Sequence, residues 1–225
     1  MSTINWQFDS MKQFIKYRLS RLGILPTLDL GRRLPEIANW IKRGCIGPAP
    51  APIKRKVLSA YLRRFELGKF IETGTHFGDT LAFMAQNKNT TCTSIEFADS
   101  YYERAVKRFE SYPNVEVLHG DSGVLLPSLV EKLEVPALFW LDGHWSGGDT
   151  GRAELDSPVS AELDSILRSS TKNHVILIDD ARCFDGSGGY PQLDNLLRTV
   201  REQSKYVCEV STDIIRLTPP GSEHL

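Results

Sequence analysis

The chain has 225 residues, which is enough for one α/β domain with a sizeable hydrophobic core and a terminal extension. Its formal net charge of −1 argues against a dedicated nucleic-acid binder, and 41% hydrophobic residues is ordinary for a globular protein. The charges are unevenly placed. Residues 1–68 hold 13 Lys/Arg and 4 Asp/Glu, whereas residues 69–225 hold 14 and 24. This asymmetry predicts a basic N-terminal region on an acidic main domain.

The spacing of the cysteines and the length of the apolar runs indicate in which cellular compartment the protein resides. The four cysteines are too far apart for a CxxC zinc motif or a disulfide framework, so a reducing compartment fits best. Asp9, Lys12, Lys16 and Arg18 interrupt any apolar run near the N-terminus, which argues against a signal peptide. No stretch approaches the ~18 apolar residues that a membrane span requires. We therefore expect a cytoplasmic protein without a transmembrane segment.

The basic N-terminal region, residues 1–68, is expected to be a helical extension. Apolar side chains over 5–22 repeat every three or four positions and form one stripe of a helix. Further helices are expected over 35–42 and 54–64, with the run GPAPAP at 47–52 as a stiff linker. We interpret the extension as a lid, as a homodimer contact, or as a helix that lies on a membrane surface.

From residue 69 onward, short β-rich segments alternate with helical segments. The expected strands cover 69–73, 91–97, 115–120, 137–142, 174–179, 206–210 and 214–217. The expected helices cover 79–86, 100–110, 123–133, 158–169 and 192–202. This alternation predicts that residues 69–225 form an α/β domain with a doubly wound, mostly parallel seven-stranded sheet. The closeness of the last two strands predicts an antiparallel hairpin at the C-terminal edge.

Polar residues and glycines stand at the carboxyl ends of five of the expected strands. In strand order they are Glu72, Gly74 and Gly78; Glu96; Asp121; Asp142 and His144; and Asp179 and Asp180. Doubly wound sheets bind their ligands beyond the carboxyl ends of the strands. Five polar strand ends in phase therefore predict a single ligand site at that edge.

The first strand leads into a glycine loop with the sequence FIETGTHFGDTL. Gly74 and Gly78 allow the backbone to turn tightly and a ligand to approach closely, and Thr75 and Thr80 offer hydroxyls. Glu96 follows Gly74 by 22 residues, about the spacing at which an acidic residue meets ribose hydroxyls. The loop therefore predicts a ligand that contains a nucleoside.

A dinucleotide is the rival ligand for this loop. The pattern is G-x-x-x-G rather than G-x-G-x-x-G, and His76 and Phe77 are bulky where a pyrophosphate needs bare backbone. Glu72 and Asp79 are expected to repel phosphate. S-adenosylmethionine (SAM) carries a positive sulfonium and no phosphate, so an acidic rim favours SAM over a dinucleotide.

Asp121 and Ser122, in the segment HGDS, follow the third strand and have two interpretations. They can contact the adenine amino group of the ligand, or they can cap the helix that follows. The two roles are compatible, and both stay open at this point.

The ordered segments E-T-G-T-x-x-G-D-T, S-I-E, G-D-S and L-D-G-H resemble the motifs of class I SAM-dependent methyltransferases over residues 69–218. LDGHWSGGDT and ILIDDAR are similar to the metal-dependent macrocin O-methyltransferase (TylF-like) group, which methylates sugars. The resemblance implies a Rossmann-like methyltransferase fold and a Mg²⁺ held by Asp142, Asp179 and Asp180. The cofactor-binding residues that it implies are Glu72, Thr73, Gly74, Thr75, Gly78, Thr80, Glu96, Asp121, Ser122 and Asp142. The segment GGDTG and Arg182 depart from the group's pattern.

The chemistry of Asp142, Asp179 and Asp180 agrees with a metal site. Three carboxylates at adjacent strand ends repel one another unless a cation neutralises them. Oxygen ligands suit a hard cation such as Mg²⁺ or Ca²⁺. The alternative is that Asp179 binds SAM or caps a helix while Asp180 pairs with Arg182.

His144 lies two residues beyond Asp142, and we predict these two as the catalytic residues. A histidine near neutral pKa can remove the acceptor's hydroxyl proton, although a loop histidine can also be a surface group or a metal ligand. The predicted reaction is metal-assisted O-methylation of a sugar, a glycan precursor or another small molecule. The alternatives are a metal-independent methyltransferase for another small molecule or a protein side chain, and a non-catalytic SAM-fold module.

Overall fold

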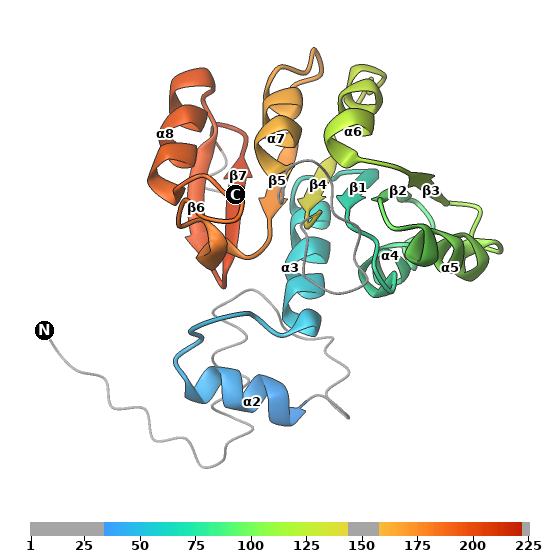
Figure 1. The fold of residues 1–225 in the computed structure, drawn as a ribbon, viewed down its shortest axis with the longest axis horizontal. Helices are drawn as coiled ribbons and strands as arrows, with labels where there is room; N and C mark the ends of the chain where they lie inside the picture. Colours follow the sequence, from blue (N-terminus) through green and yellow to red (C-terminus); the bar gives the residue numbers. More distant parts are fainter. Residues whose placement is uncertain (1–33, 144–157, 222–225) are drawn as a thin grey trace, which may run out of the picture.

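The structure of the protein is a computed structural model that describes residues 34–143 and 158–221 (Figure 1). Its helices are α2 (Leu34–Lys42), α3 (Ala51–Arg64), α4 (Asp79–Met84), α5 (Asp99–Phe109), α6 (Ser122–Glu131), α7 (Val159–Leu167), the 3-10 helix η1 (Ala181–Cys183) and α8 (Leu193–Gln203). Its strands are β1 (Lys69–Thr73), β2 (Thr91–Glu96), β3 (Val115–His119), β4 (Leu138–Leu141), β5 (Val175–Ile178), β6 (Val207–Ser211) and β7 (Ile214–Thr218).

The strands form one mixed seven-stranded sheet in the order β3-β2-β1-β4-β5-β7-β6, which Figure 1 shows from one edge to the other. Strands β1 to β5 pair in parallel, and β7 pairs antiparallel with both β5 and β6. The order reverses between β1 and β4, which is the switch point where such sheets bind ligands. The predicted α/β sheet and its antiparallel C-terminal hairpin are therefore confirmed.

Helices cover both faces of the sheet because the strand residues alternate between two hydrophobic clusters. In β4, Leu138 and Trp140 pack in the cluster that holds α2, α3, α4 and α5. Phe139 and Leu141 pack in the cluster that holds α6, α7 and α8. All four of these side chains are at most 2% exposed, as expected for a central parallel strand.

The linker predicted at 47–52 is wrong at its second half, because α3 begins at Ala51 and includes Pro52. Proline is tolerated in the first turn of a helix, where its missing N–H has no carbonyl partner within the helix. Helix α3 then packs on the sheet, with Ile53 and Leu58 fully buried against the same cluster as Trp140.

The role of the N-terminal extension and the division at residue 68 stay predictions. The stripe over 5–22, on which the dimer and membrane-surface hypotheses depend, lies outside the described residues. Every helix within 34–143 and 158–221 is too short or too polar to span a bilayer. All four cysteines are free, in agreement with the prediction that they form no disulfide framework.

Candidate functional site

The carboxyl ends of the central strands meet at one edge of the sheet. Thr73 of β1 is in register with Ile95 of β2 and with Leu141 of β4, and Leu141 is in register with Ile178 of β5. The residues that follow are Gly74, Glu96, Asp142 and Asp179. The in-phase polar ends that the sequence predicts are thus brought together.

Gly74 lies where the loop after β1 touches the end of β4. Its φ is +82°, and an added Cβ would lie 2.6 Å from the carbonyl oxygen of Asp142. The Asp142 N–H donates to the Thr73 carbonyl at 3.2 Å and lies 3.3 Å from the Thr73 hydroxyl. The close approach that requires a glycine here is therefore made by the protein's own backbone.

Gly78 begins α4 with a φ of +72° and donates its N–H to the Thr75 carbonyl at 2.7 Å. An added Cβ would lie 2.8 Å from the Phe109 ring, so α5 packs closely on this turn. Arg108 of α5 pairs with Asp79 at 2.9 Å. The glycine loop is thus fixed against α5. Thr80, in the first turn of α4, stays partly exposed.

Glu72 and Thr75 are buried beneath the loop. The Ser94 hydroxyl donates to Glu72 at 2.8 Å, and its oxygen lies 2.6 Å from the hydroxyl of Thr75. Burial raises the pKa of Glu72 to about 8, against the opposing effect of the Ser94 hydrogen bond. The expected repulsion of phosphate by Glu72 and Asp79 is therefore weaker than the sequence suggests, since burial favours the protonated form of Glu72 and Asp79 pairs with Arg108.

Glu96, at the end of β2, organises the loops on either side of it. Its two carboxylate oxygens accept the backbone N–H groups of His76 at 2.8 Å and of Ala98 at 2.9 Å. Asp121 accepts the Gly123 N–H at 2.8 Å and is the N-cap of α6, as the second of its two interpretations predicts. The cofactor-binding roles of these residues stay predictions.

Asp142, Asp179 and Asp180 form one acidic cluster. Each carboxylate places one oxygen within 4.8 Å of the other two, a separation that a hard divalent cation can bridge. Burial, followed by the charge of Asp179, raises the pKa of Asp142 well above its usual value. Burial also raises the pKa of Asp179 to about 6, although the Lys54 charge opposes that rise. The residues present therefore fit a metal ion.

Lys54, in the first turn of α3, contacts this cluster and was not predicted from the sequence. Its Nζ lies 2.6 Å from Asp179 Oδ2 and 3.2 Å from Asp180 Oδ1. Burial lowers the Lys54 pKa, but the carboxylates outweigh that effect and raise it. Arg182 pairs with Asp180 at 2.7 Å and also with Asp213. The Asp180–Arg182 pair, which was predicted as the alternative to metal binding, is thus observed. The three carboxylates nevertheless lie close enough together to hold a metal ion.

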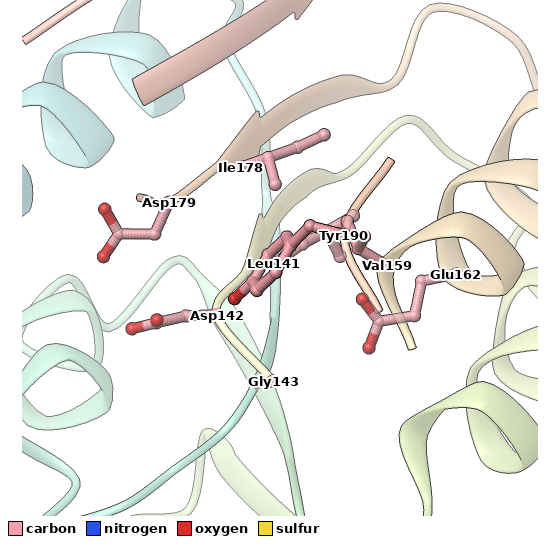
Figure 2. A pocket seen from close by; sticks show the side chains of 8 residues that line it. All are labelled: Leu141, Asp142, Gly143, Val159, Glu162, Ile178, Asp179 and Tyr190. Carbon is pink, nitrogen blue, oxygen red and sulfur yellow. The ribbon is translucent and has the colours of Figure 1, made fainter. Parts of the chain in front are cut away.

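Glu162 of α7 is a second residue that the sequence analysis missed, because an acidic residue in the first turn of a helix is ordinary. It is 1% exposed, and burial raises its pKa to about 7 against hydrogen bonds with Ser122 and Thr73. It lines a small pocket with Asp142 and Asp179. Figure 2 shows these two aspartates pointing to one side of the pocket and Glu162 lying on the other. Glu162 therefore supports the strand ends rather than joining the acidic cluster.

His144, the predicted base, and the rest of 144–157 lie outside the described residues. Its catalytic role stays a prediction. The acidic cluster comes directly before this segment in the chain, through Asp142 and Gly143.

The strand order and the site at the switch point define the Rossmann-like methyltransferase fold. No protein-family model matches the chain, and no curated relative matches it. Among solved structures, the O-methyltransferase TomG from Streptomyces achromogenes, in complex with SAM, has a TM-score of 0.56 at 15% identity and covers 94% of this chain and 100% of its own. An O-methyltransferase from Bacillus cereus, in complex with SAH, has a TM-score of 0.56 at 13% identity, with 93% and 100% covered.

A putative caffeoyl-CoA O-methyltransferase from Staphylococcus aureus is similar to the same extent. Its TM-score is 0.56 at 11% identity, with 92% of this chain and 98% of that chain covered. At such low identities the likeness establishes the fold, which this chain shares over nearly its whole length with SAM- and SAH-bound O-methyltransferases.

Proposed function

We propose that the protein is a SAM-dependent O-methyltransferase that acts on a hydroxyl of a small molecule, with help from a divalent cation. The observation that carries the proposal is the acidic cluster at the carboxyl ends of β4 and β5, next to the glycine loop of β1. The structural likeness to O-methyltransferases with SAM and SAH bound supports the donor.

The glycine loop and β2 supply the donor side of the site. Glu96, which accepts the His76 N–H, would also accept hydrogen bonds from the ribose hydroxyls, and Asp121 and Ser122 would contact the adenine amino group. The acceptor oxygen forms a bond to the methyl carbon of SAM, the carbon–sulfur bond breaks, and S-adenosylhomocysteine leaves. The protein contributes mainly positioning and charge stabilisation.

The acidic cluster supplies the acceptor side. Asp142, Asp179 and Asp180 would hold Mg²⁺ or another hard cation, which lowers the pKa of a coordinated hydroxyl and orients it. His144 takes the hydroxyl proton. The acceptor is a sugar, a glycan precursor or another molecule with neighbouring hydroxyls, and the N-terminal helices provide a lid or a homodimer contact.

Methyl transfer and chelation test this proposal together. We expect the full chain to release S-adenosylhomocysteine from SAM when it is offered a panel of sugars and catechols. EDTA should abolish turnover, and excess Mg²⁺ should restore it. Asp179→Asn should lower kcat by roughly a hundredfold or more, by analogy with the loss of other transition-state electrostatic contacts.

The matched control is Asp194→Asn on α8, an aspartate outside the cluster, which should leave kcat unchanged. Turnover that survives EDTA would remove the metal from the proposal. That result would favour the second candidate function, a metal-independent methyltransferase. The ion pairs of Lys54 with Asp179 and Asp180 favour this second candidate, since an ammonium already partly neutralises the carboxylates without a metal.

A further inference from the structure

Lys54 reaches the acidic cluster from a distant part of the chain. It precedes Asp179 by 125 residues, and its Nζ donates to Asp179 at 2.6 Å and to Asp180 at 3.2 Å. The side chain of Lys54 is 17% exposed, and that of Asp179 is 4% exposed. The contact is therefore a mostly desolvated ion pair, unlike the exposed pairs at protein surfaces, which contribute little.

The backbone that carries Lys54 is held in place. Ile53 and Leu58 of α3 are fully buried in the hydrophobic cluster on the sheet, and Val57 is 4% exposed. Figure 1 shows the first turn of α3 at the edge toward which β4 and β5 point. The four-carbon stem of Lys54 can change rotamer, whereas the helix beneath it is fixed by packing.

Lys54 binds two of the three carboxylates that would coordinate a metal ion. A divalent cation among Asp142, Asp179 and Asp180 would draw on the carboxylates of Asp179 and Asp180, which the ammonium contacts now. The ammonium and the cation would also repel each other at such short range. The two cations therefore compete for the same oxygens.

We propose that Lys54 is an intramolecular competitor for the divalent cation, so that metal binding requires its ammonium to leave Asp179 and Asp180. This inference rests on the metal site of the proposed function. In the metal-free protein, the Lys54 ammonium partly neutralises Asp179 and Asp180. In the metal-bound protein, Lys54 is released toward the acceptor side of the site. Lys54 is thus a positioning residue that sets the metal affinity.

The test is a Mn²⁺ titration of the full chain in which electron paramagnetic resonance reports free Mn²⁺. Lys54→Met keeps the length of the side chain and removes the charge, and we expect its Kd for Mn²⁺ to fall at least about tenfold below that of the wild type. Lys54→Arg should bind like the wild type. A merely structural role cannot give this result, because structural damage weakens binding.

The matched control is Lys56→Met, on the same helix over the ring of Phe83, which should leave the Kd unchanged. A Kd for Lys54→Met equal to or above that of the wild type would overturn the inference. So would the absence of Mn²⁺ binding from both proteins. That outcome leaves the donor half of the proposed function intact, because S-adenosylhomocysteine binding is measured independently of any metal.

A second measurement uses only the wild type, in case Lys54→Met does not fold. Saturating Mn²⁺ should raise the acetylation of Lys54 by an amine-reactive reagent, measured by peptide mass spectrometry, because a released ammonium gains solvent access. Lys56 provides the internal reference within the same peptide region. Equal labelling of Lys54 with and without bound Mn²⁺ would contradict the inference.

Discussion

Glu72 carries its proton at neutral pH because its side chain is buried and Ser94 offers a single hydrogen bond. Burial raises its pKa to about 8 from the usual glutamate value of 4.5. The folded state therefore holds a proton that the unfolded state has released. Between these two pKa values the folded state binds more protons, so its stability falls as the pH rises.

Glu72→Gln tests this electrostatic picture. The variant keeps a polar side chain and cannot ionise. As the pH rises from 6 to 9, its free energy of unfolding should therefore increase relative to that of the wild type by about 3 kcal/mol. Urea unfolding at both pH values measures the difference. The exposed residue Glu103 provides the control, since Glu103→Gln should show no such pH dependence. Parallel stability curves for Glu72→Gln and the wild type would contradict the buried, protonated state.

Some residues of the candidate site could be predicted from the sequence, and others could not. Asp142, Asp179 and Asp180 were predicted to meet because each follows a strand, and parallel strands end at one edge. Lys54 had no such signal, because a lysine on an amphipathic helix is ordinary until the helix is placed. Gly74 was predicted to allow a tight turn and the close approach of a ligand, but its crowding by the Asp142 carbonyl depends on the β1–β4 contact.

At the scale of elements, α3 is the segment whose role the sequence defined least. Each strand was predicted to within two residues of its observed ends, since period and turn residues determine them locally. The boundary at residue 68 was drawn from a change in charge and from the start of the β/α alternation, and neither reports the packing of α3. The buried side chains of α3 are Ile53, Val57, Leu58, Tyr61 and Leu62.

Truncation tests whether α3 belongs to the main domain, as its packing indicates, or to the N-terminal extension, as the boundary at residue 68 implies. Five buried side chains at about 2 kcal/mol each amount to roughly 10 kcal/mol, which is comparable with the whole stability of a domain. A chain of residues 69–225 should therefore lose cooperative thermal unfolding, whereas a chain of residues 34–225 should keep it. Circular dichroism melts measure both. Equal melting of the two chains would show that α3 is a dispensable part of the N-terminal extension.

For the whole molecule, the proposed donor and acceptor halves of the site would lie on either side of the β1–β4 switch point. The donor half comprises the ends of β1, β2 and β3, and the acceptor half comprises the ends of β4 and β5 with Lys54 from α3. The fold and the acidic cluster could be predicted from the alternation of strands and helices and from the polar residues at the strand ends. The pair of Arg182 with Asp180 was also among the alternatives that the sequence offered, whereas the contact of Lys54 was not, since it depends on a distant segment.

The most direct test of the account is a calorimetric titration of the full chain with S-adenosylhomocysteine. We predict one site per chain with a Kd on the order of micromolar, and binding at least about tenfold weaker for Glu96→Gln, which loses the charge that ribose hydroxyls would contact. Glu116→Gln, on the exposed part of β3, should bind like the wild type. A folded wild-type chain that binds neither S-adenosylhomocysteine nor SAM at millimolar concentration would contradict the account.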